Sequence, residues 1–515
     1  KKALLIEEDY PEAFFNSDII DSHKDRLKSA VDYFKKALTC KPDCIDTLNN
    51  LGITYSHLDE FVHAIDCFKK SIQFLSKNPK AYFNLGIVYQ KLLRFDLEIE
   101  CYRKAINIKP NYIDANWNLA LVQLLNGQFN EGWKNYKWRF KKEEKFQLRS
   151  YSKPLWDGSS LKNKTLFIYH EQGVGDTLQF IRYVKVLSNQ SAKIIFECPF
   201  NLLGLMSKIP EITHFTIPEK ELPDFDFYVP MMSIPAILNT DLKNIPKNIP
   251  YLFTEKKPQN HLLQDTHLLK IGIVWAGNPK HQQDRNRSIE LSSFKPLLAL
   301  EGTQFYSLQF GERSSDLTLD STYAKVIDLS SELNDYEDTA SIIQQLDLVI
   351  TVDTSVAHLA GAMGQPVWLL LPFIPDWRWL MDRTDSPWYP TMRLFRQQTY
   401  KDWHPVFTQL RRALKQQLNM NVADLRLLKL LWPTIHAFRN KNIPIGIHYL
   451  NDLLVMVDTF SKKLHESTVQ QIKLLLKQAL IDLKAQNYSD LSILLEEELL
   501  PLLDLSLANH FSLDN

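Results

Sequence analysis

The 515-residue sequence predicts a chain of mixed class, with a helical solenoid first, α/β domains in the middle and helices at the end. Three observations predict this. In the first quarter of the chain, leucines and aromatic residues recur every 34 positions. Short apolar runs ending in polar or glycine turns fill the middle, and from Asn421 onward leucines follow helical spacing. We expect a solenoid over 1–145, α/β domains over 146–262 and 263–415, and a helical domain over 416–515.

Composition agrees with this class and narrows the function. The chain has only 15 glycines, and scarce glycine favours helices. Lysine plus arginine equals aspartate plus glutamate at 60 each, which gives no support for nucleic-acid binding. Five cysteines without a second Cys/His pair at zinc spacing indicate reduced thiols and no metal site. No apolar run reaches the ~18 residues of a membrane span, and the start is not a signal peptide, so we expect a cytoplasmic protein.

The 34-residue period is carried by leucines and aromatics that keep register through three units. These are Leu51, Leu85 and Leu119, then Phe61, Phe95 and Phe129, then Phe68, Tyr102 and Tyr136. The pattern resembles the tetratricopeptide repeat (TPR), although Glu98 replaces the small residue found at Ala30 and Ala64, and residues 1–25 match it poorly. Such units stack because none can bury its apolar stripe alone.

Most residues of the repeat are expected to be core, so a function would reside in the groove. Asn50, Asn84 and Asn118 recur with the same period on the first helix of each unit. An asparagine at each of these places can hydrogen-bond a peptide backbone without reading its side chains. The alternative is that three surface asparagines share the register by accident. We favour a groove that binds a protein.

Two α/β series follow, each reading as strand, turn and helix. In the first, strand Lys164–His170 leads through a glycine turn into a helix over Thr177–Leu187. Its further strands are Lys193–Cys198 and Phe225–Val229. The second series comprises strands Ile271–Trp275, Gln304–Gln309, Val326–Leu329, Leu348–Val352 and Pro366–Leu371 and a helix Tyr336–Gln345. Two Rossmann-like halves of this kind suit a nucleotide-bearing substrate at the carboxyl ends of the strands.

Residues 150–410 resemble the heptosyltransferase-like glycosyltransferases of the GT-B fold. The resemblance rests on GVGDTLQF at 173–180, WAGNPKHQQDRNRS at 275–288 and DTSVAHLAGAMGQP at 353–366. With the repeat in front, the chain looks like bacterial TPR-fused glycosyltransferases that modify proteins, flagellin among them. The resemblance implies an inverting, metal-independent transfer from a nucleotide-sugar donor, with no cofactor. The architecture it implies is a TPR α-solenoid, two Rossmann-like GT-B domains and a C-terminal helical bundle.

In such a transferase an acceptor hydroxyl must lose its proton as it attacks the sugar, and a carboxylate or imidazole can take it. Asp176 matches the position of the family's catalytic base. Equally, Asp176 suits a cap of the helix expected to start at Thr177. Glu171 and His170 are the reserve candidates for the base.

The leaving nucleotide carries growing negative charge, which a helix N-terminus and cations can stabilise. Asp353 ends a strand, and Thr354, Ser355 and His358 open the next helix, where simple capping and packing are the alternative roles. Asp353 itself would hold the loop or bind a sugar hydroxyl. The remaining residues assigned to the nucleotide or its phosphates are Gly173, Gly175, Asn278, Lys280, Arg287, Gln309 and Glu312. Lys280 matches the family position better than Arg287 does.

Three functions remain open. The first is transfer of a sugar to Ser/Thr hydroxyls of a protein recruited by the repeats. The second keeps the transferase but gives it a glycan or lipid-core acceptor, with the repeats binding a partner or forming a homo-oligomer. The third is a non-catalytic TPR adaptor with a degenerate transferase fold. The aromatic segments Pro375–Trp379 and Ser386–Tyr389 either line the sugar path or form core, and core is favoured.

Overall fold

The computed structural model describes residues 24–142, 147–190, 192–218, 220–257, 267–281, 283–418, 422–439, 443–460, 466–485, 487–488, 491 and 494–499. The expectation for the first 23 residues lies outside this set. The chain divides into two compact units. The first comprises 1–149 with the short segments 239–242 and 376–381, and the second comprises the rest. No helix of the described residues is long and apolar enough to cross a membrane.

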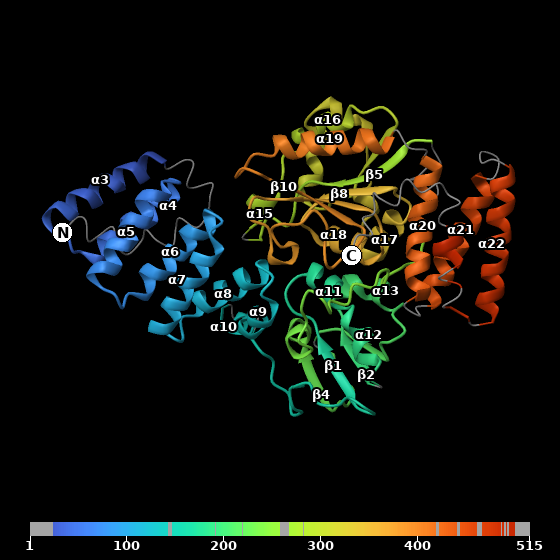
Figure 1. The fold of residues 1–515 in the computed structure, drawn as a ribbon, viewed down its shortest axis with the longest axis horizontal. Coiled ribbons are helices and arrows are strands. Elements are labelled where there is room, and N and C mark those ends of the chain that lie inside the picture. The colour runs from blue at the N-terminus through green and yellow to red at the C-terminus, as the bar shows by residue number, and fades with distance from the viewer. Residues whose placement is uncertain are drawn as a thin grey trace. The chain divides into compact units, whose positions relative to one another are not determined.

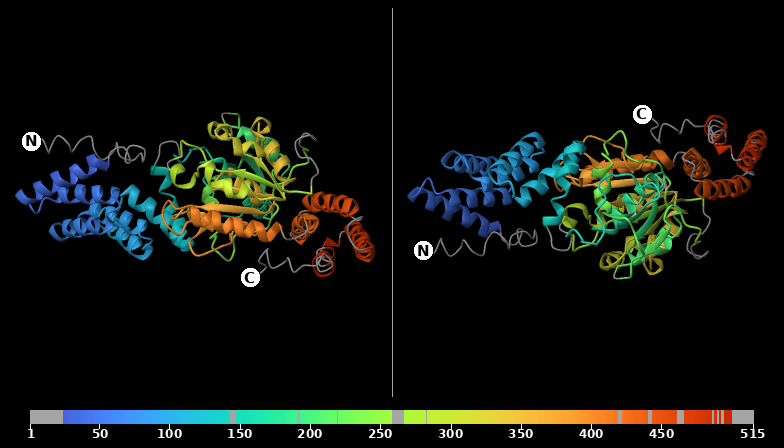
Figure 2. Two further views of the ribbon diagram at one scale, coloured as in Figure 1. Left: turned by 90° about the horizontal axis from the view of Figure 1, so that it is seen from above. Right: turned by 90° about the horizontal axis from the view of Figure 1, so that it is seen from below.

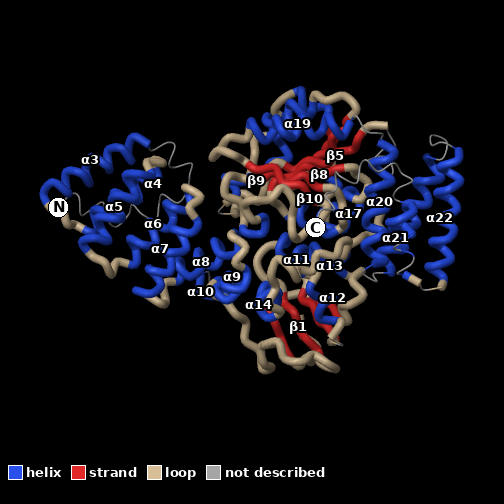
Figure 3. The backbone as a smooth tube through the Cα atoms, in the orientation of Figure 1, coloured by secondary structure: helices blue, strands red, loops and turns tan. Residues whose placement is uncertain are grey.

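The described part of the repeat region is helical, as the tube in Figure 3 shows. Its helices pair within each 34-residue unit. They are α3 (Lys24–Cys40), α4 (Ile45–His57), α5 (Phe61–Phe74), α6 (Pro79–Lys91), α7 (Phe95–Ile108), α8 (Ile113–Leu125), α9 (Phe129–Tyr136) and α10 (Arg139–Lys142). The prediction of a helical region is confirmed for the described residues.

Small residues let the paired helices approach each other. A side chain at Gly52 would begin 2.7 Å from the ring of Phe68, and one at Gly86 would begin 2.6 Å from the ring of Tyr102. Both rings are fully buried. In each unit the glycine of the first helix therefore meets the ring that lies 16 residues later, on the second helix. Because this contact repeats from unit to unit, the leucine–glycine pairs and the aromatics share one period.

The second unit contains two parallel sheets. The first has the order β3-β2-β1-β4, with β1 (Thr165–Tyr169), β2 (Lys193–Glu197), β3 (His214–Thr216) and β4 (Phe227–Pro230). Its helices are α11 (Val174–Phe180), α12 (Tyr183–Ser188), α13 (Leu203–Met206) and α14 (Ile234–Ile237). All four apolar positions after Thr165 in β1 are buried, as expected for a parallel strand covered on both faces.

The other sheet has the order β10-β9-β8-β5-β6-β7. Its strands are β5 (Leu269–Val274), β6 (Thr303–Ser307), β7 (Val326–Asp328), β8 (Leu348–Val352), β9 (Val367–Leu371) and β10 (Met392–Arg396). In Figure 1, α16 (Lys295–Leu298) and α19 (His404–Leu418) lie on one face, while α17 (Tyr336–Ile343) and α18 (Ser355–Ala362) lie on the other. The short α15 (Asp284–Arg287) follows β5 in the chain.

Three long helices follow, α20 (Val422–Arg439), α21 (Ile443–Phe460) and α22 (Glu466–Lys484). They appear in red shades in both views of Figure 2, and they share a buried apolar cluster that includes Leu431, Phe438 and Leu453. Arg426 of α20 donates through Nε to Asp347 Oδ1 at 2.9 Å and through Nη2 to Oδ2 at 3.2 Å. This buried bidentate pair attaches α20 to the residue that precedes β8.

The predicted strands and helices are largely present, with differences at their ends. Strand Leu348–Val352 has the predicted bounds. The helix expected over Thr177–Leu187 begins earlier, at Val174, and divides into α11 and α12 around Arg182. Strands β3 and β10 were not predicted. The parallel α/β regions themselves are confirmed.

Candidate active site

Asp176 lies in the first turn of α11, in the loop that leaves β1. Because α11 begins at Val174, Asp176 is its third residue rather than the residue before it, which corrects the expected start at Thr177. The Gly173 N–H donates to Asp176 Oδ2 at 2.8 Å. The carboxylate therefore stabilises the N-terminus of α11, and this capping is the alternative role that the sequence left open.

The two reserve candidates lie just before this turn and have partners of their own. Glu171 is buried, and its Oε2 accepts the Met232 N–H at 3.0 Å, which joins the end of β1 to the segment after β4. His170 Nδ1 lies 3.1 Å from Glu197 Oε1, an ion-pair distance, although the alignment of the two groups is outside that of a hydrogen bond. An imidazole beside a buried carboxylate is the arrangement of an oriented general base.

Sequence reasoning missed Glu197. It is the last residue of β2, and the strand register places it directly opposite Tyr169, the residue before His170. The available signal was an acidic residue at the end of the apolar run Lys193–Cys198. Such a carboxylate belongs to the same sheet edge as the residues after β1.

The turn between β8 and α18 holds the second group of predicted site residues. Thr354 is the residue before α18, and its hydroxyl lies 3.2 Å from that of Thr351. Ser355 Oγ lies 2.7 Å from the hydroxyl of Tyr336. Burial raises the pKa of Tyr336, so this phenol stays protonated at neutral pH. Both hydroxyls that were assigned to phosphates thus also have protein partners.

Arg287 is the cation that the structure brings to this turn. Its Nη1 donates to the carbonyl oxygen of Asp353 at 2.8 Å, and its Nε lies 3.3 Å from Asp284 Oδ1. A side chain at Gly277 would begin 2.6 Å from Arg287 Nη2, so this glycine leaves room for the guanidinium. By contrast, Lys280 is exposed, and no carboxylate of the described residues lies within ion-pair distance of it.

The remaining predicted nucleotide residues fall into two groups. Asn278 is exposed, and its Oδ1 accepts the Lys280 N–H at 3.0 Å, which closes a local turn. Gln309 is buried, with Oε1 accepting from Trp275 N at 3.1 Å and Ala276 N at 2.9 Å. Its side chain therefore ties the residues after β5 to the end of β6. Glu312 is exposed at the start of a short 3-10 turn over Glu312–Thr318.

The two turns meet at Gly175. A side chain there would begin 3.0 Å from His358 Cδ2 and 3.7 Å from the Cα of Ser355. His358 is buried, with Nδ1 2.9 Å from the Tyr389 hydroxyl and Nε2 3.9 Å from Asp353 Oδ1. The structure thus brings together Gly173, Gly175, Asp176, Asp353, Thr354, Ser355, His358 and Arg287. In the described part of the chain, no group of three or more His, Cys, Asp or Glu is arranged to hold a metal ion.

The aromatic side chains of the segments Pro375–Trp379 and Ser386–Tyr389 are core, as favoured. Trp388 and Tyr389 are fully buried, and Trp377 and Trp379 are buried too. Trp377 belongs to the first unit, where its ring meets that of Trp133 edge-on at 5.2 Å between centroids.

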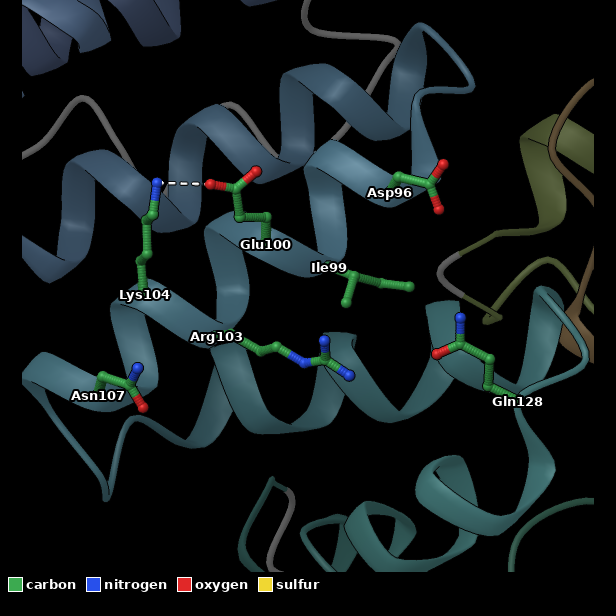
Figure 4. Close-up of a pocket in the computed structure, with 7 residues that line it drawn as sticks. All are labelled: Asp96, Ile99, Glu100, Arg103, Lys104, Asn107 and Gln128. Atoms are coloured by element: carbon green, nitrogen blue, oxygen red, sulfur yellow. Dashed lines mark ion pairs between the residues drawn. The ribbon is translucent and has the colours of Figure 1, made fainter.

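The asparagines of the repeat lie on corresponding helices, Asn50 on α4, Asn84 on α6 and Asn118 on α8. All three are partly exposed. Asn118 Nδ2 lies 3.5 Å from the Tyr102 hydroxyl, a contact that the other two lack because Phe68 takes the corresponding place before Asn84. A separate hollow of about 460 Å³ lies along α7 (Figure 4), where Glu100 pairs with Lys104.

Comparison with known proteins identifies the repeats. A model of the tetratricopeptide repeat matches residues 79–112, and a second TPR model matches residues 99–127. Over 336 residues the chain is 24% identical to Protein FlbA of Caulobacter vibrioides, which covers 58% of this chain and 54% of that protein. The chain therefore spans about half the length of the curated relative it matches.

Solved structures also match. The crystal structure of MamA is 25% identical and covers 25% of this chain and 76% of that one, with a TM-score of 0.23. YrrB, described as a TPR protein with an unusual peptide-binding site, is 19% identical, covers 27% of this chain and 74% of that one, and has a TM-score of 0.22. The N-terminal part of this chain is an array of TPR repeats.

Proposed function

We propose that the chain is a glycosyltransferase that moves a sugar from a nucleotide-sugar donor to Ser/Thr hydroxyls of a protein recruited by the TPR repeats, with flagellin as one candidate acceptor. The observation that carries the proposal is the meeting of the turn after β1 with the start of α18. Gly175 approaches His358 and Ser355, and Arg287 binds the loop at Asp353. Opposed turns at the carboxyl ends of parallel strands are where α/β proteins bind nucleotides.

In this proposal the α18 side holds the diphosphate of the donor. The positive end of the helix dipole, the guanidinium of Arg287 and the imidazole of His358 all favour negative charge there. That charge grows as the nucleotide leaves, so the same groups would stabilise the transition state more than the bound donor. The resemblance to GT-B transferases adds that the reaction is inverting and metal-independent.

The turn after β1 would then supply the base that deprotonates the acceptor. A carboxylate can accept several hydrogen bonds, so the cap that Asp176 Oδ2 forms with the Gly173 N–H does not by itself exclude catalysis. His170 is the competitor, because its Nδ1 lies 3.1 Å from the buried carboxylate of Glu197 and an imidazole is a common general base. Asp176 remains the proposed base on the family resemblance.

Substitutions separate the candidate bases. Asp176→Asn keeps the shape of the cap and removes the base, so turnover is expected to fall by about a hundredfold or more. His170→Gln should lower turnover less, since in this proposal the imidazole lies near the base and does not take the proton itself. Undiminished turnover of Asp176→Asn together with loss in His170→Gln would transfer the role to His170.

The protein acceptor is assigned to the repeats because TPR arrays bind other proteins along a groove. Asn50 and Asn84 are partly exposed and have no side-chain hydrogen bond to any described residue, so their amides are available to a peptide. Replacing both by alanine should lower modification of an intact protein and leave hydrolysis of the donor unchanged. Equal transfer to a small glycan or lipid acceptor would favour the second acceptor class instead.

The primary experiment is a thermal-shift and calorimetric screen of the full chain against nucleoside diphosphates. A transferase should bind at least one of them, and Arg287→Met should weaken that binding. If none binds and no nucleotide sugar is turned over, the chain is a TPR adaptor with a degenerate α/β region.

A further inference from the structure

Arg182 is a buried cation without an acidic partner. It lies between α11 and α12 and is only 4% exposed. No carboxylate of the described residues lies within ion-pair distance of its guanidinium. A buried charge without a counter-ion is costly, so its presence needs an explanation beyond packing.

The guanidinium is held by neutral groups from distant parts of the second unit. Nε donates to Gln179 O at 2.7 Å, Nη1 to Trp388 O at 2.7 Å and Pro246 O at 3.1 Å, and Nη2 to the Tyr251 hydroxyl at 2.8 Å. It also lies 4.7 Å from the centre of the Tyr389 ring and 4.8 Å from that of Tyr251. Carbonyl dipoles and aromatic faces solvate the charge but do not cancel it.

The phenols do not cancel it either. Burial raises the pKa of Tyr251, and it raises the pKa of Tyr389 well above its ordinary value. Both hydroxyls are therefore protonated at neutral pH. Arg182 therefore keeps its full positive charge in a buried region of low dielectric.

Tyr389 connects this charge to the candidate site. Its hydroxyl lies 2.9 Å from His358 Nδ1, and the two rings meet edge-on at 5.7 Å between centroids. The Tyr389 ring also fills the space beside Gly361, where a side chain would begin 2.6 Å from it. On its other side His358 meets Gly175. The imidazole is thus fixed between α11 and Tyr389, with Nε2 3.9 Å from Asp353 Oδ1 at the start of α18.

We propose that Arg182 is a positioning residue of the donor site, which acts through Tyr389 to fix the imidazole of His358 against the diphosphate of the donor. The inference rests on the proposed function. It adds that binding of the diphosphate depends on a series of contacts that begins at Arg182, between α11 and α12 of the first α/β region. The series runs from the Arg182 guanidinium over the Tyr389 ring to His358 Nδ1.

The test uses Tyr389→Phe, which removes one hydroxyl and keeps the ring under Arg182. The matched control is Tyr449→Phe, which removes a buried phenol hydroxyl that donates to Met363 O at 2.8 Å, next to the opposite end of α18. Calorimetry compares the nucleoside diphosphate that binds the wild-type chain with its monophosphate. Tyr389→Phe should weaken the diphosphate about tenfold and the monophosphate much less. Tyr449→Phe should leave the affinities for the diphosphate and for the monophosphate unchanged.

Two further variants make the result decisive. Tyr389→Phe combined with His358→Gln should bind the diphosphate no more weakly than His358→Gln alone, because both act through one imidazole. Arg182→Lys keeps the positive charge but loses the planar, forked set of guanidinium donors. It should therefore also weaken binding of the diphosphate more than binding of the monophosphate. The inference is overturned if Tyr389→Phe matches Tyr449→Phe, or if its effect adds fully to that of His358→Gln. Absence of diphosphate binding by the wild-type chain would instead overturn the proposed function, and this inference with it.

Discussion

Glu98 is a buried acid at a position where neighbouring repeats have a small residue. It is fully buried, and its Oε1 accepts from Gln90 Nε2 at 2.9 Å. Burial raises the pKa of Glu98 from 4.5 to about 8, against the opposing effect of hydrogen bonds from Tyr102 and Gln90. The folded array therefore holds a proton that the unfolded chain releases at much lower pH.

This proton makes the stability of the array depend on pH. The folded-state pKa of Glu98 is raised, so its favourable contribution is complete below about pH 4.5 and is lost as the pH rises to about 8. Glu98→Gln should remove this dependence, raising the melting temperature at pH 9 relative to the unsubstituted chain and changing it little at pH 4.5. Thermal melts followed by circular dichroism measure it. Glu100→Gln on the same helix is the control, and an equal gain there would contradict the assignment.

Gly175 allows α11 and α18 to approach each other closely, because it has no side chain. A methyl group there would begin 3.0 Å from His358 Cδ2, tighter than ordinary contact, so the imidazole must move by a few tenths of an ångström. Gly175→Ala should weaken nucleoside diphosphate binding by about tenfold, because small displacements in a binding site are costly. In Gly173→Ala the new methyl meets only Asp176 Oδ2, at 3.3 Å. Calorimetric affinities that are equal for the two variants would argue against a role for His358.

At the scale of elements, apolar runs located most of the core strands, because a parallel strand buried on both faces reads as continuous hydrophobic sequence. Strand β8 was predicted with its bounds. Strand β10 was missed because it alternates, with Arg393 exposed between buried Met392 and Leu394. Strand β3 has only three residues, His214–Thr216, and gives no run to detect.

The partners of the site residues were beyond sequence reasoning for a different reason. The pattern placed Gln309 at the end of a strand, where a ligand role and a structural role look alike. Three of its side-chain hydrogen bonds to backbone groups depend on Trp275 and Ala276 after β5, which lie more than thirty residues earlier. Likewise, the pairing of His170 with Glu197 follows from strand order, which periodicity does not determine.

Lys429 of α20 makes the stability of the contact between this helix and the residues after α17 depend on pH. Its Nζ donates to Gln344 O at 2.6 Å and also to Leu346 O, next to the end of α17. Burial lowers the pKa of Lys429 from 10.5 to about 8. The folded chain thus gives up this proton at lower pH than the unfolded chain, so stability rises between about pH 8 and pH 10.5.

Lys429→Met should abolish that rise. Hydrogen exchange of α20 amides, measured at matched intrinsic rates between pH 7.5 and 9.5, should show protection increasing with pH in the unsubstituted chain and staying level in the variant. The difference between the two chains isolates Lys429 from other groups that titrate in this range. A rise of the same slope in both chains would show that another group is responsible.

At the scale of the whole molecule, the first unit is not made of the repeats alone. It includes 239–242 and 376–381, which come from the later sequence. Trp133 of α9 is buried there, and its Nε1 donates to Thr240 O at 3.0 Å. Its ring meets Trp377 at 5.2 Å, and Tyr136 meets Trp377 at 6.1 Å. The last repeat helix therefore shares a core with residues that a boundary near 145 assigns elsewhere.

Two truncations test this shared core. Removing residues 1–127 leaves α9 with Trp133 and Tyr136 in place, so the remaining chain should stay soluble and unfold cooperatively. Removing residues 1–142 exposes Trp377 and the carbonyl of Thr240, which should lower the unfolding temperature and promote aggregation. Trp133→Ala in the full chain should cost about 3–5 kcal/mol of this core's stability, the usual loss for a buried tryptophan. If both truncations melt at the same temperature, the aromatic contacts of α9 do not support the later segments.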